Sequence, residues 1–253
     1  MVGHLVITGT SGSIGAALAR ALRARHPGAA MSLLDVDLAR SRALAGALGG
    51  DAVAVGCDLS SSDDAARALD EARAARGPVT GLVNCAGVME VAALERLEWA
   101  KAEALLAIDL VSPLRLLHAS TPELLRARGF VVNVSSMAGA VTLSGCAFYG
   151  AAKAGLAMAS EIARHELAPR GVRVVTVYPG PVASALEARA KAQYGGGWLT
   201  RALPTGDADE LARLVVTALD RGRARVIYPR VYGLGRLPFA GAVARAIGPR
   251  PSG

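Results

Sequence analysis

The amino-acid sequence predicts a doubly wound α/β domain, in which helices cover both faces of a mostly parallel sheet. Short apolar runs typical of buried strands alternate with longer Ala- and Arg-rich segments typical of amphipathic helices. The chain has 253 residues, of which 52% are hydrophobic, so it can bury a sizeable core. Glycine-rich or polar residues follow the apolar runs. We therefore expect one domain over residues 1–253, with its functional site at the carboxyl ends of the strands.

The expected strands and helices follow one another along the whole chain. The expected strands cover residues 5–7, 31–34, 52–56, 82–83, 130–134 and 172–177. The expected helices begin at 16–19, and cover 61–76, 94–125 with interruptions, and about 146–168. Pro169 ends the last helix, because the residue before a proline is disfavoured in helical geometry.

A glycine-rich turn connects the first expected strand to the first expected helix. Glycines let the backbone approach a pyrophosphate, and a helix N-terminus supplies free N–H groups and a positive dipole end. A plain tight turn is the alternative interpretation. The candidate cofactor-binding residues of this turn are Gly9, Ser11, Ser13, Ile14 and Gly15.

Asp35 ends the second expected strand, twenty residues after Gly15. A carboxylate there would accept hydrogen bonds from the adenosine ribose hydroxyls and repel a 2′-phosphate, which predicts NAD as the preferred cofactor. NADP remains possible because Arg40 and Arg42 follow closely in the sequence. Asp37 is a competing candidate for the ribose, and an aspartate in a surface turn is the other alternative.

Tyr149 and Lys153 lie four residues apart in an Ala-rich segment, so a helix would place both side chains on one face. A cation about 4 Å from a phenol is worth roughly 4 kcal/mol at an effective dielectric of about 20. Such an interaction could lower a tyrosine pKa from about 10 toward 7. The spacing therefore predicts a tyrosine that exchanges a proton near neutral pH. A half-buried tyrosine beside a solvated lysine is the alternative.

Ser136 stands thirteen residues before Tyr149, just after the apolar run 130–134. A hydroxyl at the end of a strand, followed by a loop and the Tyr149 helix, offers a second donor to an oxygen that already faces Tyr149. The three residues Ser136, Tyr149 and Lys153 are therefore the candidate catalytic group.

The three cysteines, Cys57, Cys85 and Cys146, lie singly and without the spacing of metal ligands. We expect free thiols and no metal site. The N-terminus lacks a charged region followed by an apolar stretch and a cleavage site, so we expect no signal peptide. These features predict a cytoplasmic protein.

The net charge of +7 raises the question of a nucleic-acid partner, which requires clustered basic residues. The arginines are spread through predicted amphipathic helices, which indicates solvated helix faces and no nucleic-acid partner. The uncharged run 129–152 has the length of a membrane span, but it contains Asn133 and five hydroxyl residues, which disfavour a spanning helix.

Together these motifs resemble the short-chain dehydrogenase/reductase family in its single-domain form, over essentially the whole chain. The resemblance implies a Rossmann-like fold and a nicotinamide cofactor. The matching residues are Thr8 and Gly9 with Gly15, Asp58, the run Asn84-Cys85-Ala86-Gly87, Ser136, Tyr149, Lys153, and Pro179-Gly180 with Val182 and Ser184.

The resemblance also implies a role for each matching residue. Tyr149 is the expected acid/base, Ser136 is expected to hold the substrate oxygen, and Lys153 is expected to bind the nicotinamide ribose while lowering the tyrosine pKa. The Pro-Gly segment is expected to contact the carboxamide. Beyond the glycine-rich turn and Asp35, the implied cofactor-binding residues are Asp58, Leu59, Asn84, Ala86, Gly87, Tyr149, Lys153, Pro179, Gly180, Val182 and Ser184.

By the same resemblance we expect a homodimer or homotetramer that forms through the two long helices. The small residues Ala152, Gly155 and Ala159 would let these helices pack closely against a partner.

Two residues depart from the family pattern. Ser13 stands where the second glycine of the cofactor turn belongs, and Asp109 stands where the family has an active-site asparagine. In the family this position acts through its main-chain carbonyl, which holds a water at a kink in the helix. Pro113 has no N–H for the carbonyl at i−4 and pushes it aside. We therefore expect the Asp109 carbonyl to lie unpaired and to face Lys153 through a water, unless Pro113 simply begins a new helix.

The sequence thus predicts an NAD(P)-dependent oxidoreductase that transfers a hydride between the cofactor and a secondary alcohol or ketone. A catalytically weak dinucleotide-binding or scaffold protein is one alternative, because Ser13 and Asp109 could disable turnover. A membrane-peripheral dehydrogenase of a lipid-like alcohol is another, based on aromatic and basic residues in the tail, about 226–253. Membrane contact is nevertheless less expected than an ordinary C-terminal segment.

The substrate itself cannot be read from the sequence. The segment of about 185–205 contains three glycines between Tyr194 and Trp198, which suggests a mobile lid over the substrate. A disordered surface loop would have the same composition.

Overall fold

The computed structural model describes residues 3–193 and 204–231, and its core is the predicted doubly wound sheet. Seven strands pair in the order β3-β2-β1-β4-β5-β6-β7, and every pairing is parallel. The strands are β1 (His4–Thr8), β2 (Ala30–Asp35), β3 (Ala52–Gly56), β4 (Gly81–Asn84), β5 (Phe130–Val134), β6 (Arg173–Pro179) and β7 (Arg225–Tyr228). The chain crosses from β3 back to β4 beside β1, so a topological switch point lies between β1 and β4.

The expected helices are present, although the one expected from residue 94 begins at Trp99, and the long helix ends at Leu167, just before Pro169. The sequence did not predict the helix Leu38–Leu48. The α-helices are α1 (Ser13–Arg25), α2 (Leu38–Leu48), α3 (Ser62–Arg76), α4 (Trp99–Leu106), α5 (Ser112–Ala127), α6 (Ala147–Leu167), α7 (Ala185–Gln193) and α9 (Ala208–Asp220). The tighter or wider turns are η1 (Ala107–Val111), η2 (Met137–Gly139) and η3 (Ala168–Arg170).

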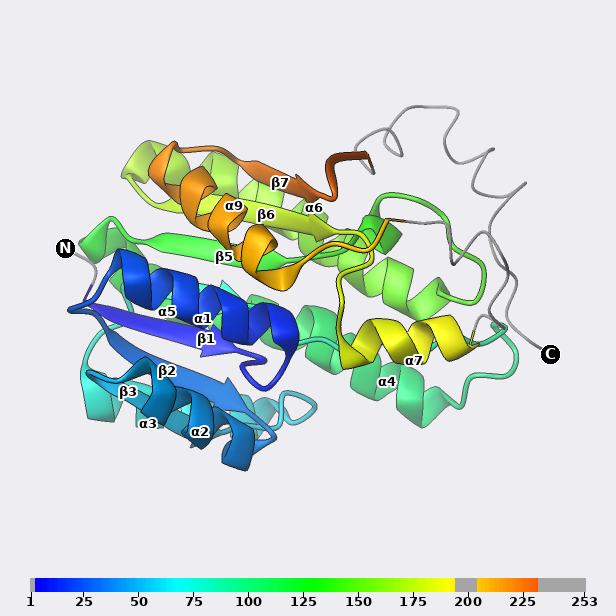
Figure 1. The fold of residues 1–253 in the computed structure, drawn as a ribbon, viewed down its shortest axis with the longest axis horizontal. Helices are drawn as coiled ribbons and strands as arrows, with labels where there is room; N and C mark the ends of the chain where they lie inside the picture. The colour runs from blue at the N-terminus through cyan, green and yellow to red at the C-terminus, as the bar shows by residue number, and fades with distance from the viewer. Residues whose placement is uncertain (1–2, 194–203, 232–253) are drawn as a thin grey trace.

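Two separate apolar cores lie on the two faces of the sheet, because successive strand side chains point to opposite faces. Leu5 and Ile7 of β1 pack with α1, α2 and α9, whereas Val6 packs with α3, α5 and α6. In Figure 1, α1 and α9 lie in front of the sheet and α5 and α6 lie behind it. Helices thus cover both faces, as predicted.

The C-terminal part of the described chain differs from the expectation. The tail was expected from residue 226, but Val226 and Tyr228 lie buried in β7, which pairs with β6. Helix α9, which the sequence analysis did not predict, covers β6 and β7. The first part of the expected lid is helix α7, and its glycine-rich part lies outside the described residues, as does the tail from residue 232.

The uncharged run 129–152 is divided among β5, the η2 turn and the start of α6, so it forms no single helix. Another stretch, Trp99–Ala127, is long and apolar enough by length and composition to cross a membrane. A helix that packs one face against a sheet passes the same test, and Leu116, Leu117 and Leu124 of this stretch lie in the core behind the sheet.

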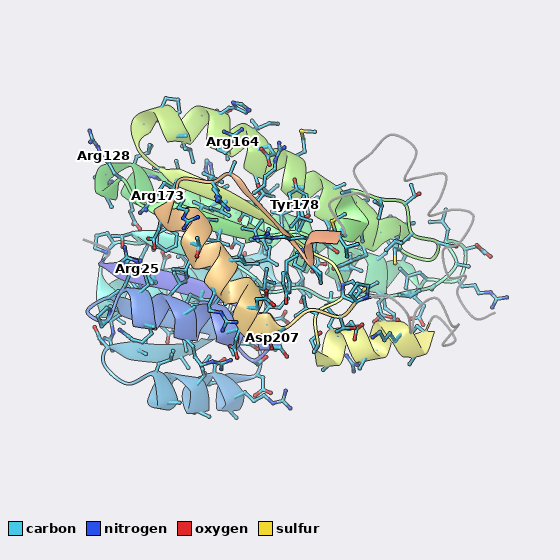
Figure 2. All side chains as sticks on the ribbon, turned by 45° about the horizontal axis from the view of Figure 1, so that its top comes forward. Arg25, Arg128, Arg164, Arg173, Tyr178 and Asp207 are labelled. Carbon is cyan, nitrogen blue, oxygen red and sulfur yellow. The ribbon has the colours of Figure 1, made fainter. Side chains whose placement is uncertain are left out.

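Figure 2 shows Arg25, Arg128 and Arg173 at the end of the molecule where the strands begin, away from Asp207 at the start of α9. Arg173 also places its guanidinium 6.0 Å from the ring centre of Phe130.

Candidate active site

A cavity of about 280 Å³ opens at the carboxyl ends of β1, β2 and β4, beside the switch point. Most of the residues predicted to bind a cofactor line it. These residues are Gly9, Ser11, Ser13, Ile14, Gly15, Asp35, Asp58, Leu59, Ala86, Gly87 and Ser184.

Gly9 and Gly15 allow three segments of backbone to meet at the floor of this cavity. Gly9 has a φ of +72°, and a Cβ there would lie 2.5 Å from the Cα of Ala86. A Cβ on Gly15 would collide with the carbonyl oxygen of Gly9. Both glycines are therefore needed for close approach of the backbone, as the nucleotide-binding turn requires.

The N-terminus of α1 faces the same cavity through Gly12, Ser13 and Ile14. The N-cap is Gly12, and no side chain caps the first turn. The first N–H groups of a helix have no partner within the helix, so they are available to an anion. Ser13, where the family has a glycine, is the first helical residue and is exposed, so its side chain is accommodated at the cavity edge.

The structure decides between Asp35 and Asp37. The Asp35 side chain lines the cavity and accepts hydrogen bonds from the main-chain N–H and the hydroxyl of Ser11, at 2.8 and 2.9 Å. Asp37 instead caps α2 by accepting from the N–H of Arg40, and it pairs with the Arg40 guanidinium at 3.3 Å. Of the two, Asp35 is therefore the carboxylate that lines the cavity, and its contact with the cofactor stays a prediction.

Asn84 is an exception among the predicted cofactor residues. Its amide points into the protein, donating to the Pro113 carbonyl at 3.1 Å and to Asn133 at 2.8 Å. The Asn133 amide in turn donates to Ser160 of α6 at 2.7 Å. Because Asn84 does not line the cavity, the structure gives its side chain the role of connecting β4, β5 and two helices.

The segment after β6 approaches the cavity mainly through Ser184. Ser184 lines the cavity and accepts a hydrogen bond from the N–H of Glu187 at the start of α7. Main-chain hydrogen bonds position the preceding residues. Gly180 donates its N–H to the carbonyl of Tyr228 in β7. Val182 forms an isolated β-bridge with Gly206. Pro179, Gly180 and Val182 do not line the described cavity, and their predicted cofactor contacts stay predictions.

Tyr149 and Lys153 occupy one face of α6, as predicted from their spacing, and both are buried. The Lys153 ammonium lies 5.9 Å from the centre of the Tyr149 ring and donates to the Val134 carbonyl at 3.3 Å. Ser136, at the end of β5, hydrogen-bonds to Tyr149. The three candidate catalytic side chains therefore lie together.

This group lies directly beside the cavity. A Cβ on Gly87, which lines the cavity, would lie 3.1 Å from the Lys153 ammonium and 3.2 Å from Oδ1 of Asp109. A side chain at residue 87 would therefore separate the cavity from the catalytic group. Glycine at this position leaves the ammonium at the cavity wall.

The predicted lowering of the Tyr149 pKa is not found. Burial raises the pKa of Tyr149 above its ordinary value, the Asp109 carboxylate raises it further, and the hydrogen bond with Ser136 opposes both. The sequence argument counted the attraction of one nearby ammonium. It included neither the loss of water around the phenol nor a carboxylate that is 40 positions away in the sequence.

Asp109 lies in the π-helical turn η1 and is fully buried. Its Oδ1 accepts from the N–H of Val88 at 2.9 Å, and its Oδ2 lies 3.7 Å from the Lys153 ammonium. Burial raises the pKa of Asp109 to about 6, while Lys153 and the Val88 N–H oppose this rise. The side chain, which the sequence argument set aside, thus faces Lys153. The expectation for the Asp109 carbonyl stays a prediction.

The sequence analysis missed several residues of the cavity wall. Most are direct neighbours of predicted residues, so the signal that could have found them is their position at the same strand ends. Ile108 comes from η1, which only the three-dimensional fold brings to the cavity. The missed residues are Gly12, Leu34, Val36, Cys57, Cys85, Val88, Ile108 and Leu186.

A cavity at the switch point of a parallel sheet, beside Ser136 and the buried Tyr149 and Lys153, is the arrangement of a nicotinamide-dependent oxidoreductase. The family model described as short chain dehydrogenase matches residues 3–195. A D-threitol dehydrogenase of Mycolicibacterium smegmatis is 34% identical over 218 residues, which are 83% of each chain. The chain belongs to the short-chain dehydrogenase/reductase family.

Solved structures agree with this assignment. A short-chain dehydrogenase from Sphingobium yanoikuyae in complex with NADPH superposes with a TM-score of 0.80 at 27% identity, covering 97% of this chain and 95% of that one. A 3-ketoacyl-(acyl-carrier-protein) reductase from Brucella melitensis complexed with NADH has the same fold, with a TM-score of 0.77 at 22% identity over 90% of this chain and 98% of that one. The protein is an NAD(P)-dependent oxidoreductase that acts on an alcohol or ketone.

Proposed function

We propose that the protein is an NAD(H)-preferring dehydrogenase of secondary alcohols, with Tyr149 as its acid/base. The observation that supports the cofactor preference is Asp35, a buried carboxylate on the cavity wall at the end of β2. A 2′-phosphate beside this carboxylate would bring two anions together without a counter-ion. Arg40, the nearest candidate counter-ion in the sequence, is engaged by Asp37.

The residues of the cavity suit a dinucleotide. The uncapped start of α1 can hold the pyrophosphate, and Asp35 can hold the adenosine ribose. Asp58 and Leu59 can contact the adenine. Lys153, beside Gly87, can hold the other ribose. The nicotinamide supplies the hydride chemistry when the cofactor is bound.

The three side chains beyond β5 then handle the substrate oxygen. Ser136 holds it by a hydrogen bond, and Tyr149 gives a proton to a ketone or takes one from an alcohol. Lys153 holds a positive charge beside this oxygen, which favours the alkoxide character that develops during the reaction. Burial of Tyr149 and Lys153 strengthens these interactions, because water screens them little.

The cofactor preference is tested by titration calorimetry of the purified protein with NADH and with NADPH. We expect tighter binding of NADH, because only NADPH places a phosphate beside Asp35. Asp35→Asn should narrow the difference, since the repulsion is removed. As a matched control, Asp70→Asn, at an exposed aspartate of α3 that does not line the cavity, should leave the ratio of the two affinities unchanged. Tighter NADPH binding by the parent protein would contradict the proposal.

The substrate is tested with the same protein. A panel of secondary alcohols and ketones, followed by the absorbance of the reduced nicotinamide, should reveal turnover of at least one compound. The absence of turnover across a broad panel, together with intact NADH binding, would favour the alternative of a dinucleotide-binding scaffold protein.

We also propose a homodimer that forms through the outer face of α4, η1 and α6. Of the small residues first expected there, Ala152 is fully buried within its own subunit, and a Cβ on Gly155 would lie 3.2 Å from Leu110 of the same subunit. The outer face instead exposes large apolar side chains, which is typical of an interface. These side chains are Trp99, Val111, Met158 and Ile162. Light scattering of the parent and of Met158→Glu would test this, with a dimer and a shift toward monomer expected.

The cytoplasm is the proposed location of the protein. Cys57, Cys85 and Cys146 form no disulfide bond, which suits a reducing compartment. Fractionation of cells that express the chain should place it with cytoplasmic markers. Recovery with the membrane fraction would favour the membrane-peripheral alternative.

A further inference from the structure

Asp109 is a buried carboxylate at a position where the family has a neutral amide. Among the residues that the structure describes, only Asp35 and Asp109 are buried acidic side chains, and Asp109 has no exposed surface. One of its oxygens, Oδ2, makes no hydrogen bond with any described group. Burying a carboxylate with so few partners costs free energy of folding. Among the described residues, the cation that pairs with it is Lys153.

The contacts of Asp109 connect the cavity wall to the catalytic group. Its Oδ1 holds the N–H of Val88, which lines the cavity, and its Oδ2 lies 3.7 Å from the Lys153 ammonium. This distance makes an ion pair and is too long for a hydrogen bond. Gly87 leaves room for the pair, since its Cβ position lies against both charged groups.

We propose that Asp109 is a positioning residue whose carboxylate balances the charge of Lys153, and thereby sets the pH at which Tyr149 takes the proton of an alcohol. This inference rests on the proposed acid/base role of Tyr149. An asparagine at residue 109 would leave the ammonium as the one full charge in the group, and the phenolate would form more easily.

The charges around Tyr149 support this assignment. Lys153 lies on the same helix, Asp109 on η1, Cys146 at the start of α6, and Ser136 after β5. Burial is the main cause of the raised pKa of Tyr149, and the Asp109 carboxylate is the next. Because Tyr149, Lys153 and Asp109 are all buried, salt screens their interactions little.

The first test measures the proton on Tyr149 directly, in the protein without cofactor. The absorbance of tyrosinate is titrated for the parent and for Asp109→Asn, and the curve of the matching Tyr149→Phe protein is subtracted from each. We expect the midpoint of the Tyr149 titration to fall by at least about one pH unit in Asp109→Asn, because this variant no longer carries the negative charge that disfavours tyrosinate. An unchanged or higher midpoint would overturn the inference.

The second test measures the pH profile of alcohol oxidation, with any substrate that the panel identifies. The acid limb of kcat/KM should move to lower pH in Asp109→Asn by the same amount as the tyrosinate midpoint. The asparagine side chain can still accept a hydrogen bond from the Val88 N–H. If Asp109 acted only by holding Val88, Asp109→Asn would therefore leave the pH of the acid limb unchanged. Asp109→Ser also removes the charge, and it should move the limb in the same direction.

A matched control removes an acidic charge elsewhere. Asp70 on α3 is exposed and pairs with Arg73, so Asp70→Asn should leave both the midpoint and the limb unchanged. Different results would contradict the two proposals. Full turnover by Tyr149→Phe would contradict the acid/base role of Tyr149. Loss of turnover in Tyr149→Phe, combined with an unchanged midpoint and acid limb in Asp109→Asn, would contradict only the role of Asp109.

Discussion

The cofactor cavity and the catalytic group lie side by side but depend on different parts of the chain. At the cavity, main-chain atoms set the shape, because Gly9 and Gly15 let strands, turn and helix meet without side chains between them. Beyond Gly87, the buried side chains of Tyr149, Lys153 and Asp109, together with Ser136, set the chemistry. The first region depends on a few glycines that can be recognised in the sequence. The second depends on burial and on contacts between residues far apart in the chain.

The largest expected effect concerns the buried ion pair of the catalytic group. Lys153→Met would leave the Asp109 carboxylate buried without its cation, which should cost roughly 3–5 kcal/mol of unfolding free energy. Adding Asp109→Asn should recover most of this loss, because the uncompensated charge is then gone. Chemical denaturation of the parent, the two single variants and the double variant measures the cycle.

An exposed pair provides the matched control for that cycle. Lys101 lies 3.1 Å from Glu98, and both side chains are mostly in solvent. Lys101→Met should therefore cost less than about 1 kcal/mol. If both lysine substitutions cost the same, the contrast between the buried group and the rest of the molecule would be wrong.

A smaller effect is expected in the cavity region. Gly15→Ala places a methyl group against the Gly9 carbonyl, so it should cost about 1–3 kcal/mol and weaken NADH binding. Gly28→Ala is the control, because a Cβ there meets nothing within 4 Å. Denaturation and calorimetry measure the two quantities. Equal behaviour of the two variants would contradict the role given to close backbone approach.

The contrast between the two regions also explains what the sequence could predict. The glycine spacing and the residues that directly follow the apolar runs, such as Asp35, identified the cavity because each of these patterns lies within a short stretch of sequence. The four-residue spacing placed Tyr149 and Lys153 correctly for the same reason. The pKa of Tyr149 was predicted in the wrong direction, because it depends on desolvation and on Asp109. The bond of the Asn84 side chain to the distant Asn133 was not predicted, and the predicted contact of Asn84 with the cofactor stays a prediction.

The smallest expected effect lies outside both regions. His4 in β1 is buried between Ser32 and the Gly77 carbonyl, and burial is the main cause that lowers its pKa below 6.5. The unfolded chain therefore binds a proton at His4 more readily than the folded protein does. The unfolding free energy is accordingly at its full value above pH about 6.5 and decreases as the pH falls toward the folded pKa of His4. The slope should not exceed about 1.4 kcal/mol per pH unit.

Comparing the parent with His4→Gln isolates this contribution. His26, whose pKa is also lowered, and Asp109, which titrates in the opposite sense, are present in both proteins. The parent should lose more unfolding free energy than the variant between pH 7 and pH 5, as measured by denaturation. Parallel curves would show that His4 titrates alike in the folded and unfolded chains.

The turnover of Tyr149→Phe tests the central claim most directly, that the Ser136, Tyr149 and Lys153 group performs the proton transfer. With a substrate that the parent accepts, the variant should lose at least the roughly 10²–10⁴-fold typical of a general acid/base. Its affinity for NADH should stay close to that of the parent, because Tyr149 does not line the described cavity. Near-full turnover by Tyr149→Phe would contradict the account.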